Sequence, residues 1–383
     1  MTQSAQPAGP PRLPGVPGGS APDRVVRARA WLCDLPVEQV RTDAVQSFVK
    51  QETIFVELET QSGVVGLGYA YTIGTGGGAV LDLLRQTLLE TVVGQDVHGP
   101  ERIWADAFTI TRATTTGAIT SLALAALDTA VWDARCRALG LGLWQLAGGF
   151  RDRVPVYDTE GGWLHLSEDE LVEHARQSLA DGLGGVKIKI GKPSGVEDRR
   201  RLAAVRGAVG DELDIMVDAN QSFTAAEAIR RSRMLVDLDV FWFEEPLPAD
   251  DIAGHARLAS LTTVPIAVGE SLYAAASFRE YLQRGAAGIV QVDVARVGGI
   301  TPWLKVAHLA ETFNVHVAPH FLMELHLPLL CAIPNGLYLE RIPQLRAITT
   351  SDITIRDGHA EVPRTPGLGI DWDREAIEAL TVA

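Results

Sequence analysis

Three acidic residues, each at the end of a short apolar run, carry the strongest chemical signal in the sequence. Asp218, Glu244 and Glu270 follow one another at intervals of 26 residues. A buried strand that ends in an acid, repeated at one interval, is typical of a (β/α)8 barrel, in which catalytic groups lie at the carboxyl ends of the strands. Three such carboxylates suit Mg²⁺, with substrate or water filling the remaining positions. The alternative is a set of exposed strand ends, and the equal intervals argue against it.

Two lysines in the preceding strand have the spacing of side chains that share one face. Lys187 and Lys189 alternate with apolar residues in Val186–Ile190, and alternate residues of a strand point to the same side. Taken alone, this segment fits a solvent-facing edge strand equally well. In a barrel, both ammonium groups would enter the mouth. A divalent cation beside a lysine lowers the pKa of its ammonium group, which suits the lysine to act as a base.

The last three strand ends predict an acid/base pair and a further carboxyl group. Asp293 and His320 are expected at the ends of the sixth and seventh strands, within hydrogen-bond reach of each other. A carboxylate that holds one ring nitrogen raises the basicity of the other, whereas a lone histidine is more often a core residue. Glu340 is expected at the end of the eighth strand. If protonated, it would donate a hydrogen bond to a substrate oxygen; a salt-bridged strand end is the alternative.

Three other polar residues are candidates for contact with a substrate. Asn220 lies two residues beyond Asp218, where it would contact substrate or orient a ligand. Asp158 ends the first expected barrel strand. Lys50 belongs to the polar loop 41–51 and is a candidate partner for a distal carboxylate. A polar loop fits a polyhydroxylated chain, whose hydroxyl groups each need a partner, better than it fits an aromatic ring.

These residues need a scaffold, and the chain divides into four segments. Residues 1–24 are rich in proline and glycine and indicate a flexible tail. Residues 25–150 predict a small α+β domain, and residues 151–343 alternate short strands with helices, which indicates parallel βα units. Residues 344–383 are expected to fold back on the small domain. The predicted class is therefore α/β: a modified (β/α)8-type TIM barrel, with a capping domain built from the N-terminal region and the C-terminal tail.

Composition and charge exclude several classes of function. The 383 residues are 46% hydrophobic and 21% charged, which is ordinary for a globular protein. A formal net charge of −14 makes nucleic acid and anionic membranes poor partners. We expect neither a secretion signal nor a membrane span, and three scattered cysteines fit free thiols in a reducing compartment. A cytoplasmic location is therefore expected. A small-molecule carboxylate substrate and a homo-oligomeric state are further expectations, which composition does not decide.

The whole constellation resembles the enolase superfamily, specifically its mandelate racemase subgroup. The positions that carry this likeness are Lys187-x-Lys189, Asp218, Glu244, Glu270, Asp293 with His320, and Glu340, together with the stretches Val217–Ser222, Phe243–Leu247 and Val297–Ile300. A narrower likeness is to the galactarate/L-talarate dehydratases, which act on acid sugars. It rests on Tyr157–His165, Asp251–Arg257 and Ala318–His326.

The resemblance implies an enzyme that removes the proton α to a carboxylate. Mg²⁺ on the three acids would stabilise the enediolate, helped by Lys187 and Glu340. Lys189 and His320 would be bases on opposite faces of the α-carbon, which permits loss of a β-hydroxyl or epimerisation. We favour a hydro-lyase acting on galactarate or a related C6 aldarate, with racemisation of an α-hydroxy acid as the alternative. A non-catalytic binding protein on the same barrel is a third reading, and the complete acid/base set argues against it.

Overall fold

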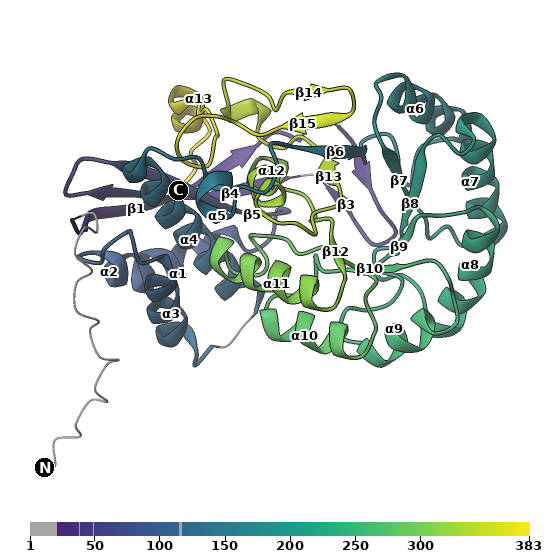
Figure 1. Ribbon diagram of the computed structural model, residues 1–383, viewed down its shortest axis with the longest axis horizontal. Helices are drawn as coiled ribbons and strands as arrows, with labels where there is room; N and C mark the ends of the chain where they lie inside the picture. The colour runs from purple at the N-terminus through teal and green to yellow at the C-terminus, as the bar shows by residue number, and fades with distance from the viewer. Residues whose placement is uncertain (1–20, 38, 49, 115–116) are drawn as a thin grey trace, which may run out of the picture.

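The computed structural model describes residues 21–37, 39–48, 50–114 and 117–383 (Figure 1). Most of the tail predicted for residues 1–24 therefore lies outside the described residues. Its last part belongs to the fold, because Asp23 accepts hydrogen bonds from the backbone N–H of Ser62 at 3.0 Å and from the Thr60 hydroxyl at 2.9 Å. Regular structure then begins with the first strand at Val25.

A small α+β unit forms the N-terminal part of the chain. Its antiparallel sheet has the order β1 (Val25–Leu35), β4 (Gln51–Thr60), β5 (Val65–Thr72). A two-stranded hairpin, β2 (Arg41–Thr42) and β3 (Ser47–Phe48), leaves this sheet. The remaining elements are helical: α1 (Gly77–Leu83), a π-helical turn (Leu84–Leu88), α2 (Leu89–Val92), α3 (Pro100–Thr111), α4 (Ala118–Leu139) and α5 (Leu143–Ala147).

Strand β5 lies directly on helix α4, and two glycines make this approach possible. A Cβ atom at Gly68 would lie 2.1 Å from the backbone nitrogen of Ala130 and 2.4 Å from Thr129 Oγ1. A Cβ atom at Gly66 would lie 2.6 Å from the Ala130 carbonyl oxygen. The sheet thus meets the helix backbone to backbone, which fixes the position of β5 relative to the rest of the molecule.

Gly68→Ala should therefore lower the free energy of unfolding by about 1–3 kcal/mol, because the added methyl group overpacks a backbone contact. Gly78→Ala is the matched control: a Cβ atom there meets nothing within 4 Å, and alanine favours the helix by up to about 1 kcal/mol. Urea unfolding of both variants measures the difference. Equal midpoints for Gly68→Ala and the wild type would contradict the close packing of β5 on α4.

A ring of parallel strands follows the small unit in the described range 117–383, and it confirms the predicted fold class. The strands pair in sequence order from β6 to β12, and β13 pairs with β6. A bridge between Val317 and Gly336 closes the remaining gap. The strands are β6 (Arg153–Asp158), β7 (Gly185–Lys189), β8 (Asp214–Asp218), β9 (Trp242–Glu244), β10 (Ile266–Val268), β11 (Ile289–Val290), β12 (His316–Val317) and β13 (Leu339–Arg341).

Helices connect successive strands of the ring and cover its outside (Figure 1). Local sequence signals place their ends: α6 begins after Ser167, whose hydroxyl accepts from the Glu170 backbone while Glu170 accepts from the Ser167 backbone in return. After β13 the chain leaves the ring. The helices are α6 (Glu168–Ala180), α7 (Gly195–Val209), α8 (Ala225–Asp237), α9 (Ile252–Ala259), α10 (Ala275–Gln283), α11 (Ile300–Thr312) and α12 (Met323–Ala332).

The C-terminal tail contacts the small domain, as the sequence predicted, and also the barrel. The hairpin β14 (Ile355–Arg356) and β15 (His359–Glu361) adds to the barrel sheet, because β15 pairs antiparallel with β6. The last turn, α13 (Arg374–Ala379), leads back to β1, where the backbone N–H of Leu32 donates to Ala383 at 2.8 Å. The hairpin pairs with Arg153–Pro155 at the start of β6, whereas β7 and β13 pair with the residues of β6 that follow, so β15 covers backbone that the ring itself leaves unpaired.

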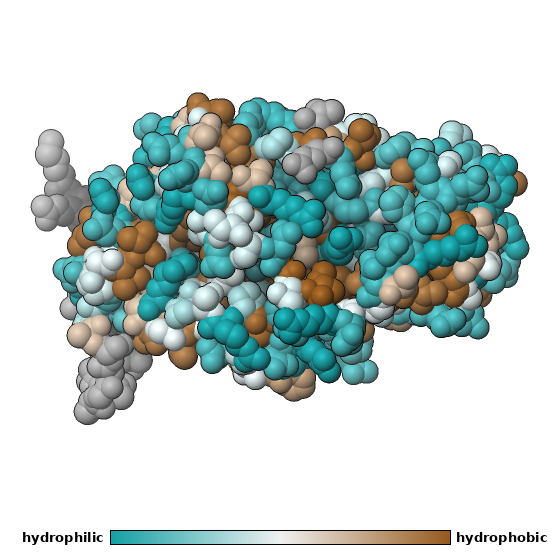
Figure 2. All heavy atoms as spheres, turned by 90° about the horizontal axis from the view of Figure 1, so that it is seen from above, coloured by the Kyte–Doolittle hydropathy of each residue, from teal (hydrophilic) through white to brown (hydrophobic). Residues whose placement is uncertain are grey.

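Hydrophilic residues predominate on the face shown in Figure 2, with hydrophobic residues scattered among them. Among the described residues, no helix has the length and apolar character needed to cross a membrane.

Candidate active site

The predicted site residues lie at one end of the barrel, but only some of them stand on strands. Lys187 and Lys189 belong to β7, Asp218 and Glu244 end β8 and β9, and Glu340 lies in β13. Glu270 lies two residues beyond β10, and Asp293 and His320 lie three residues beyond β11 and β12. The expectation that these last three residues end their strands was wrong. Loops carry them, because the strands of this half of the ring are only two or three residues long.

Asp218, Glu244 and Glu270 form a group that fits a divalent cation. Each offers a carboxylate oxygen, and these oxygens all lie within 4.8 Å of one another. All three side chains are buried. Burial and the nearby Asp218 raise the pKa of Glu244 to about 7, which expresses the cost of gathering these charges away from water. A hard cation would remove that cost, and three carboxylate oxygens suit Mg²⁺.

The two lysines contact the same carboxylates. Lys187 is 1% exposed and lies 3.0 Å from Glu244 and 2.8 Å from Glu340. Lys189 bonds to Asp218. Burial alone would lower the pKa of Lys189, but the Asp218 carboxylate outweighs it and raises the pKa. This direction differs from the expected lowering, because that expectation assumed a cation on these carboxylates, which would oppose the ammonium charge instead of attracting it.

Asp293 and His320 form a buried pair beside the carboxylate group. His320 Nδ1 lies 2.9 Å from Asp293 Oδ2, and its Nε2 lies 3.1 Å from Glu270 Oε2. Burial alone would raise the pKa of Asp293, but the hydrogen bond and charge of His320 outweigh it and lower the pKa to about 2. Asp293 is therefore ionised. It holds the ring so that Nε2 points toward the proposed metal ligands.

Glu340 is an acceptor of hydrogen bonds, which contradicts the expectation that it is protonated. Its oxygens accept from Lys187 at 2.8 Å, from the Thr159 hydroxyl at 2.7 Å and from the backbone N–H of Phe321 at 2.7 Å. Burial alone would raise the pKa of Glu340, but the Lys187 ammonium holds that pKa well below its usual range. With three donors around it, the carboxyl group has no reason to carry a proton of its own.

The three candidates for substrate contact separate in the structure. Asn220 lines the cavity above the carboxylates, and its buried Oδ1 has no hydrogen-bond partner among the described residues. Asp158 and Lys50 are not part of the cavity lining. Asp158 accepts from Arg341 at 2.8 Å and from the backbone of Gly161 at 2.9 Å.

Lys50 is held by acidic side chains outside the cavity lining. It immediately precedes β4. Its ammonium group lies 3.2 Å from Glu52 and 3.1 Å from Asp34. The polar loop was the correct segment, because it contributes Asp43 and Gln46 to the cavity lining, but Lys50 is not part of that lining.

Several cavity residues were missed by the sequence analysis. The hairpin β2–β3 supplies some of them, and it is held to the barrel by Arg41, which lies 2.5 Å from Glu160. The polar loop was a sequence signal for the hairpin residues. Arg296 could have been found from its position three residues beyond Asp293. No local sequence pattern marks Tyr71 or Thr159. The missed lining residues include Phe48, Tyr71, Thr159 and Arg296, whereas Asp43 and Gln46 belong to the polar loop that the sequence identified.

Both the small domain and the barrel are similar to known proteins. A family model described as the mandelate racemase/muconate lactonizing enzyme N-terminal domain matches residues 25–148, and one described as enolase C-terminal domain-like matches residues 170–376. The chain is 35% identical over 363 residues to an L-talarate/galactarate dehydratase of Salmonella typhimurium, covering 92% of this chain and 90% of that protein.

Two further similarities bear on the site. The chain is 33% identical over 360 residues to a 3,6-anhydro-α-L-galactonate cycloisomerase of Streptomyces coelicolor, covering 94% of this chain and 99% of that protein. It is also similar to the crystal structure of an L-talarate dehydratase from a Polaromonas species, complexed with Mg and L-glucarate. That similarity has a TM-score of 0.90 at 36% identity and covers 94% of this chain and 98% of the other.

Proposed function

The chain belongs to the mandelate racemase/muconate lactonizing enzyme family, and from that premise we propose that it is a Mg²⁺-dependent acid-sugar dehydratase. The observation that carries the proposal is the arrangement around the three carboxylates. Lys189 enters from the second strand of the ring and His320 from beyond the seventh, so two groups able to move a proton flank the same group of ligands. Dehydratases of acid sugars among the relatives support the same activity.

The proposed reaction breaks two bonds of the substrate. One base takes the proton from the α-carbon, and the electron pair forms a double bond to the β-carbon as the β-hydroxyl leaves. A proton from the other group, with His320 the favoured donor, makes the leaving group water. The resulting enol rearranges to a 2-keto-3-deoxy acid. Mg²⁺ bound by Asp218, Glu244 and Glu270 would supply positive charge beside the substrate carboxylate.

The other residues of the site are proposed to hold these groups in place. Lys187 adds a second positive charge beside the substrate carboxylate. Glu340 keeps Lys187 ionised through their contact at 2.8 Å. Asp293 orients His320. Asn220 would accept a hydrogen bond from a substrate hydroxyl, because its buried Oδ1 has no partner among the described residues and a buried acceptor without a partner is unfavourable.

The polar part of the cavity lining supports a polyhydroxylated substrate, and it lies beside apolar side chains such as Phe48, Trp163 and Ile342. Asp43 and Gln46 from the hairpin, together with Asn220 and Thr159, offer polar atoms, and sugar hydroxyl groups each need such a partner. We propose galactarate or a related C6 aldarate as substrate. Racemisation of an α-hydroxy acid is the second candidate, since two bases around one carbon also permit it.

A panel of aldarates and aldonates, assayed with a ketone-specific colour reaction, should show turnover of acid sugars that carry a β-hydroxyl. Mandelate is the matched negative substrate, because it has an α-proton but no β-hydroxyl to lose. Proton exchange in D₂O, followed by NMR, reports the first step alone. Turnover of mandelate combined with no product from every acid sugar would favour the racemase. Homo-oligomeric assembly and a cytoplasmic location stay predictions, and light scattering would test the first.

A further inference from the structure

We propose that Tyr71, a residue of the small domain, is a positioning residue for the His320 acid/base group. This inference rests on the proposed function, because it concerns one of the two groups that would move a proton. The Tyr71 hydroxyl lies 2.7 Å from Asp293 Oδ2, the same oxygen that lies 2.9 Å from His320 Nδ1. Tyr71 and Asp293 are both buried. Thus a side chain from β5 completes the pair that the barrel supplies.

The hydrogen bonds around this oxygen run in one direction. Arg296 Nε donates to the Tyr71 hydroxyl oxygen at 3.2 Å, and a guanidinium group can only donate. The Tyr71 hydroxyl must therefore give its own proton to Asp293. The other oxygen of Asp293 accepts from the backbone N–H of Ala295 at 2.8 Å and of Arg296 at 3.1 Å. Every group around Asp293 is a donor, so the carboxylate is saturated and ionised.

This arrangement selects the tautomer of His320. An ionised Asp293 only accepts, so Nδ1 of His320 must carry the proton. When the ring is neutral its free electron pair is on Nε2, and when the ring is protonated Nε2 donates to Glu270 Oε2 at 3.1 Å. The nitrogen that gains and loses the proton is therefore the one that faces the proposed metal ligands. Without the Tyr71 hydroxyl, Asp293 Oδ2 would keep only its hydrogen bond to His320, while the two backbone N–H groups still hold Oδ1. The direction of Oδ2, and with it the orientation of the histidine ring, would be less tightly fixed.

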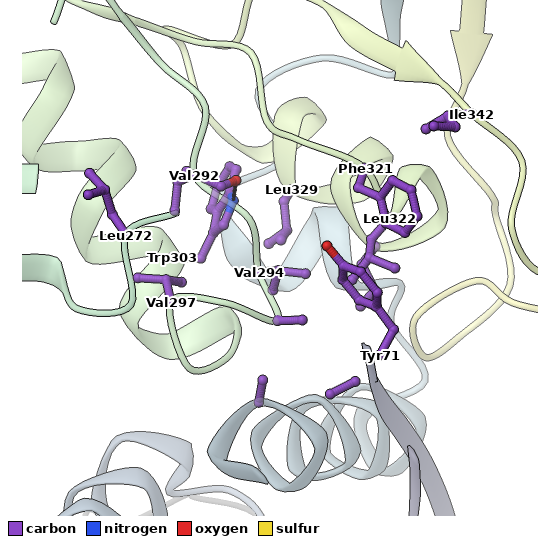
Figure 3. Packing of buried hydrophobic residues seen from close by; sticks show 14 of the residues in the cluster. Tyr71, Leu272, Val292, Val294, Val297, Trp303, Phe321, Leu322, Leu329 and Ile342 are labelled. Carbon is purple, nitrogen blue, oxygen red and sulfur yellow. Dashed lines mark hydrogen bonds between the residues drawn. The ribbon is translucent and has the colours of Figure 1, made fainter. Parts of the chain in front are cut away.

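Tyr71 also supports His320 through an aromatic contact. The ring of Phe321 lies 4.7 Å from the Tyr71 ring and is stacked on His320 at 5.2 Å. Phe321 has φ 64°, a left-handed conformation that residues other than glycine rarely adopt. Its N–H donates to Glu340 at 2.7 Å. Figure 3 shows the Tyr71 hydroxyl pointing from its strand toward the segment at Val294, with Phe321 beside the ring.

The other proposed base does not share this support. Lys189 bonds to Asp218, and its ammonium group lies 5.4 Å from the centre of the Trp163 ring. Both contacts come from the opposite part of the cavity wall, on β8 and in the loop after β6. Loss of the Tyr71 hydroxyl should therefore affect proton transfer through His320 and leave transfer through Lys189 unchanged. A general loss of structure would slow proton transfer through both groups, so slowing on the His320 face alone indicates a positioning role.

The test compares two variants that make the same chemical change on the same strand. Tyr71→Phe removes the hydroxyl and keeps the ring on Phe321. Tyr69→Phe is the matched control, because the buried Tyr69 hydroxyl has no hydrogen-bond partner among the described residues. Exchange of the α-proton in D₂O is measured by NMR for both α-epimers of an acid-sugar substrate, so that each face is followed separately. Tyr71→Phe should slow exchange on the His320 face by about 10- to 100-fold, while Tyr69→Phe should leave both faces at the wild-type rate.

Each other outcome has a definite meaning. If Tyr71→Phe slows exchange equally on both faces, or on neither face, the positioning role is wrong. Normal exchange by the wild-type enzyme would still support the proposed function. If the wild type itself shows exchange on neither face, the proposed function fails and this inference fails with it. Phe321→Leu is a second variant in case Tyr71→Phe does not fold. It removes the ring between Tyr71 and His320 and should slow exchange on the His320 face. An unchanged ratio of the exchange rates on the two faces in this variant counts against the proposal.

Discussion

Removal of divalent metal ions should abolish turnover, and addition of Mg²⁺ should restore it. The oxygens of Asp218, Glu244 and Glu270 lie within 4.8 Å of one another, and the three side chains are buried. Without a cation the three carboxylates repel one another, and Lys187 and Lys189 bind to Glu244 and Asp218. The substrate carboxylate would then meet negative charge instead of positive charge. Loss of the metal removes both the binding of the substrate and the stabilisation of the charge that develops on it.

A single substitution sharpens this prediction. Glu244→Gln should weaken Mg²⁺ binding by more than about 100-fold, since loss of a partner that only supports a ligand already costs about 10- to 100-fold. Glu245→Gln is the comparison variant: the Glu245 carboxyl group accepts from Gln221 at 3.0 Å and lies outside the convergent group, so its loss should weaken Mg²⁺ binding less, by at most about 10- to 100-fold. Calorimetric titration with Mg²⁺ measures both. Full turnover after exhaustive chelation would refute the metal assignment.

Replacing either proposed base should block proton exchange on one face of the α-carbon only. Lys189→Ala and His320→Asn should each slow exchange on their own face by about 10²- to 10⁴-fold, the usual contribution of a positioned acid or base. Asp293→Asn should act as a milder form of His320→Asn, by about 10- to 100-fold, because it loses the orientation of the ring and keeps the ring itself. NMR of α-proton exchange in D₂O with both epimers distinguishes the faces.

Lys50→Ala is the control for these two variants. It removes an ammonium group of the same kind as that of Lys189, but one that is bound to Asp34 and Glu52 outside the cavity. Its exchange and turnover should match the wild type. A large rise in KM for a diacid would instead support the distal-carboxylate role that the sequence suggested. If Lys189→Ala or His320→Asn retained exchange with both epimers, the two-base mechanism would be wrong.

Much of the fold and most of the site followed from local patterns. The run that ends at Asp218 matches β8 residue for residue, because a buried strand needs apolar side chains on both faces and its last residue faces the barrel mouth. The alternation at Lys187 and Lys189 placed both ammonium groups inside the ring, since side chains in a strand repeat every two residues. Periodicity of this kind depends on neighbours in the chain, so it is visible without a structure.

The tertiary structure decided which group each of these side chains meets. Glu340 is ionised because Lys187, Thr159 and Phe321 surround it with donors. Lys50 is held outside the cavity lining by Asp34 and Glu52. Tyr71 reaches Asp293 across 222 residues of sequence. Apolar alternation and strand ends are local properties, so the sequence determined the barrel and its acids. Protonation states and hydrogen-bond partners depend on what lies opposite in space, and only the closed ring with the small domain against it determined them.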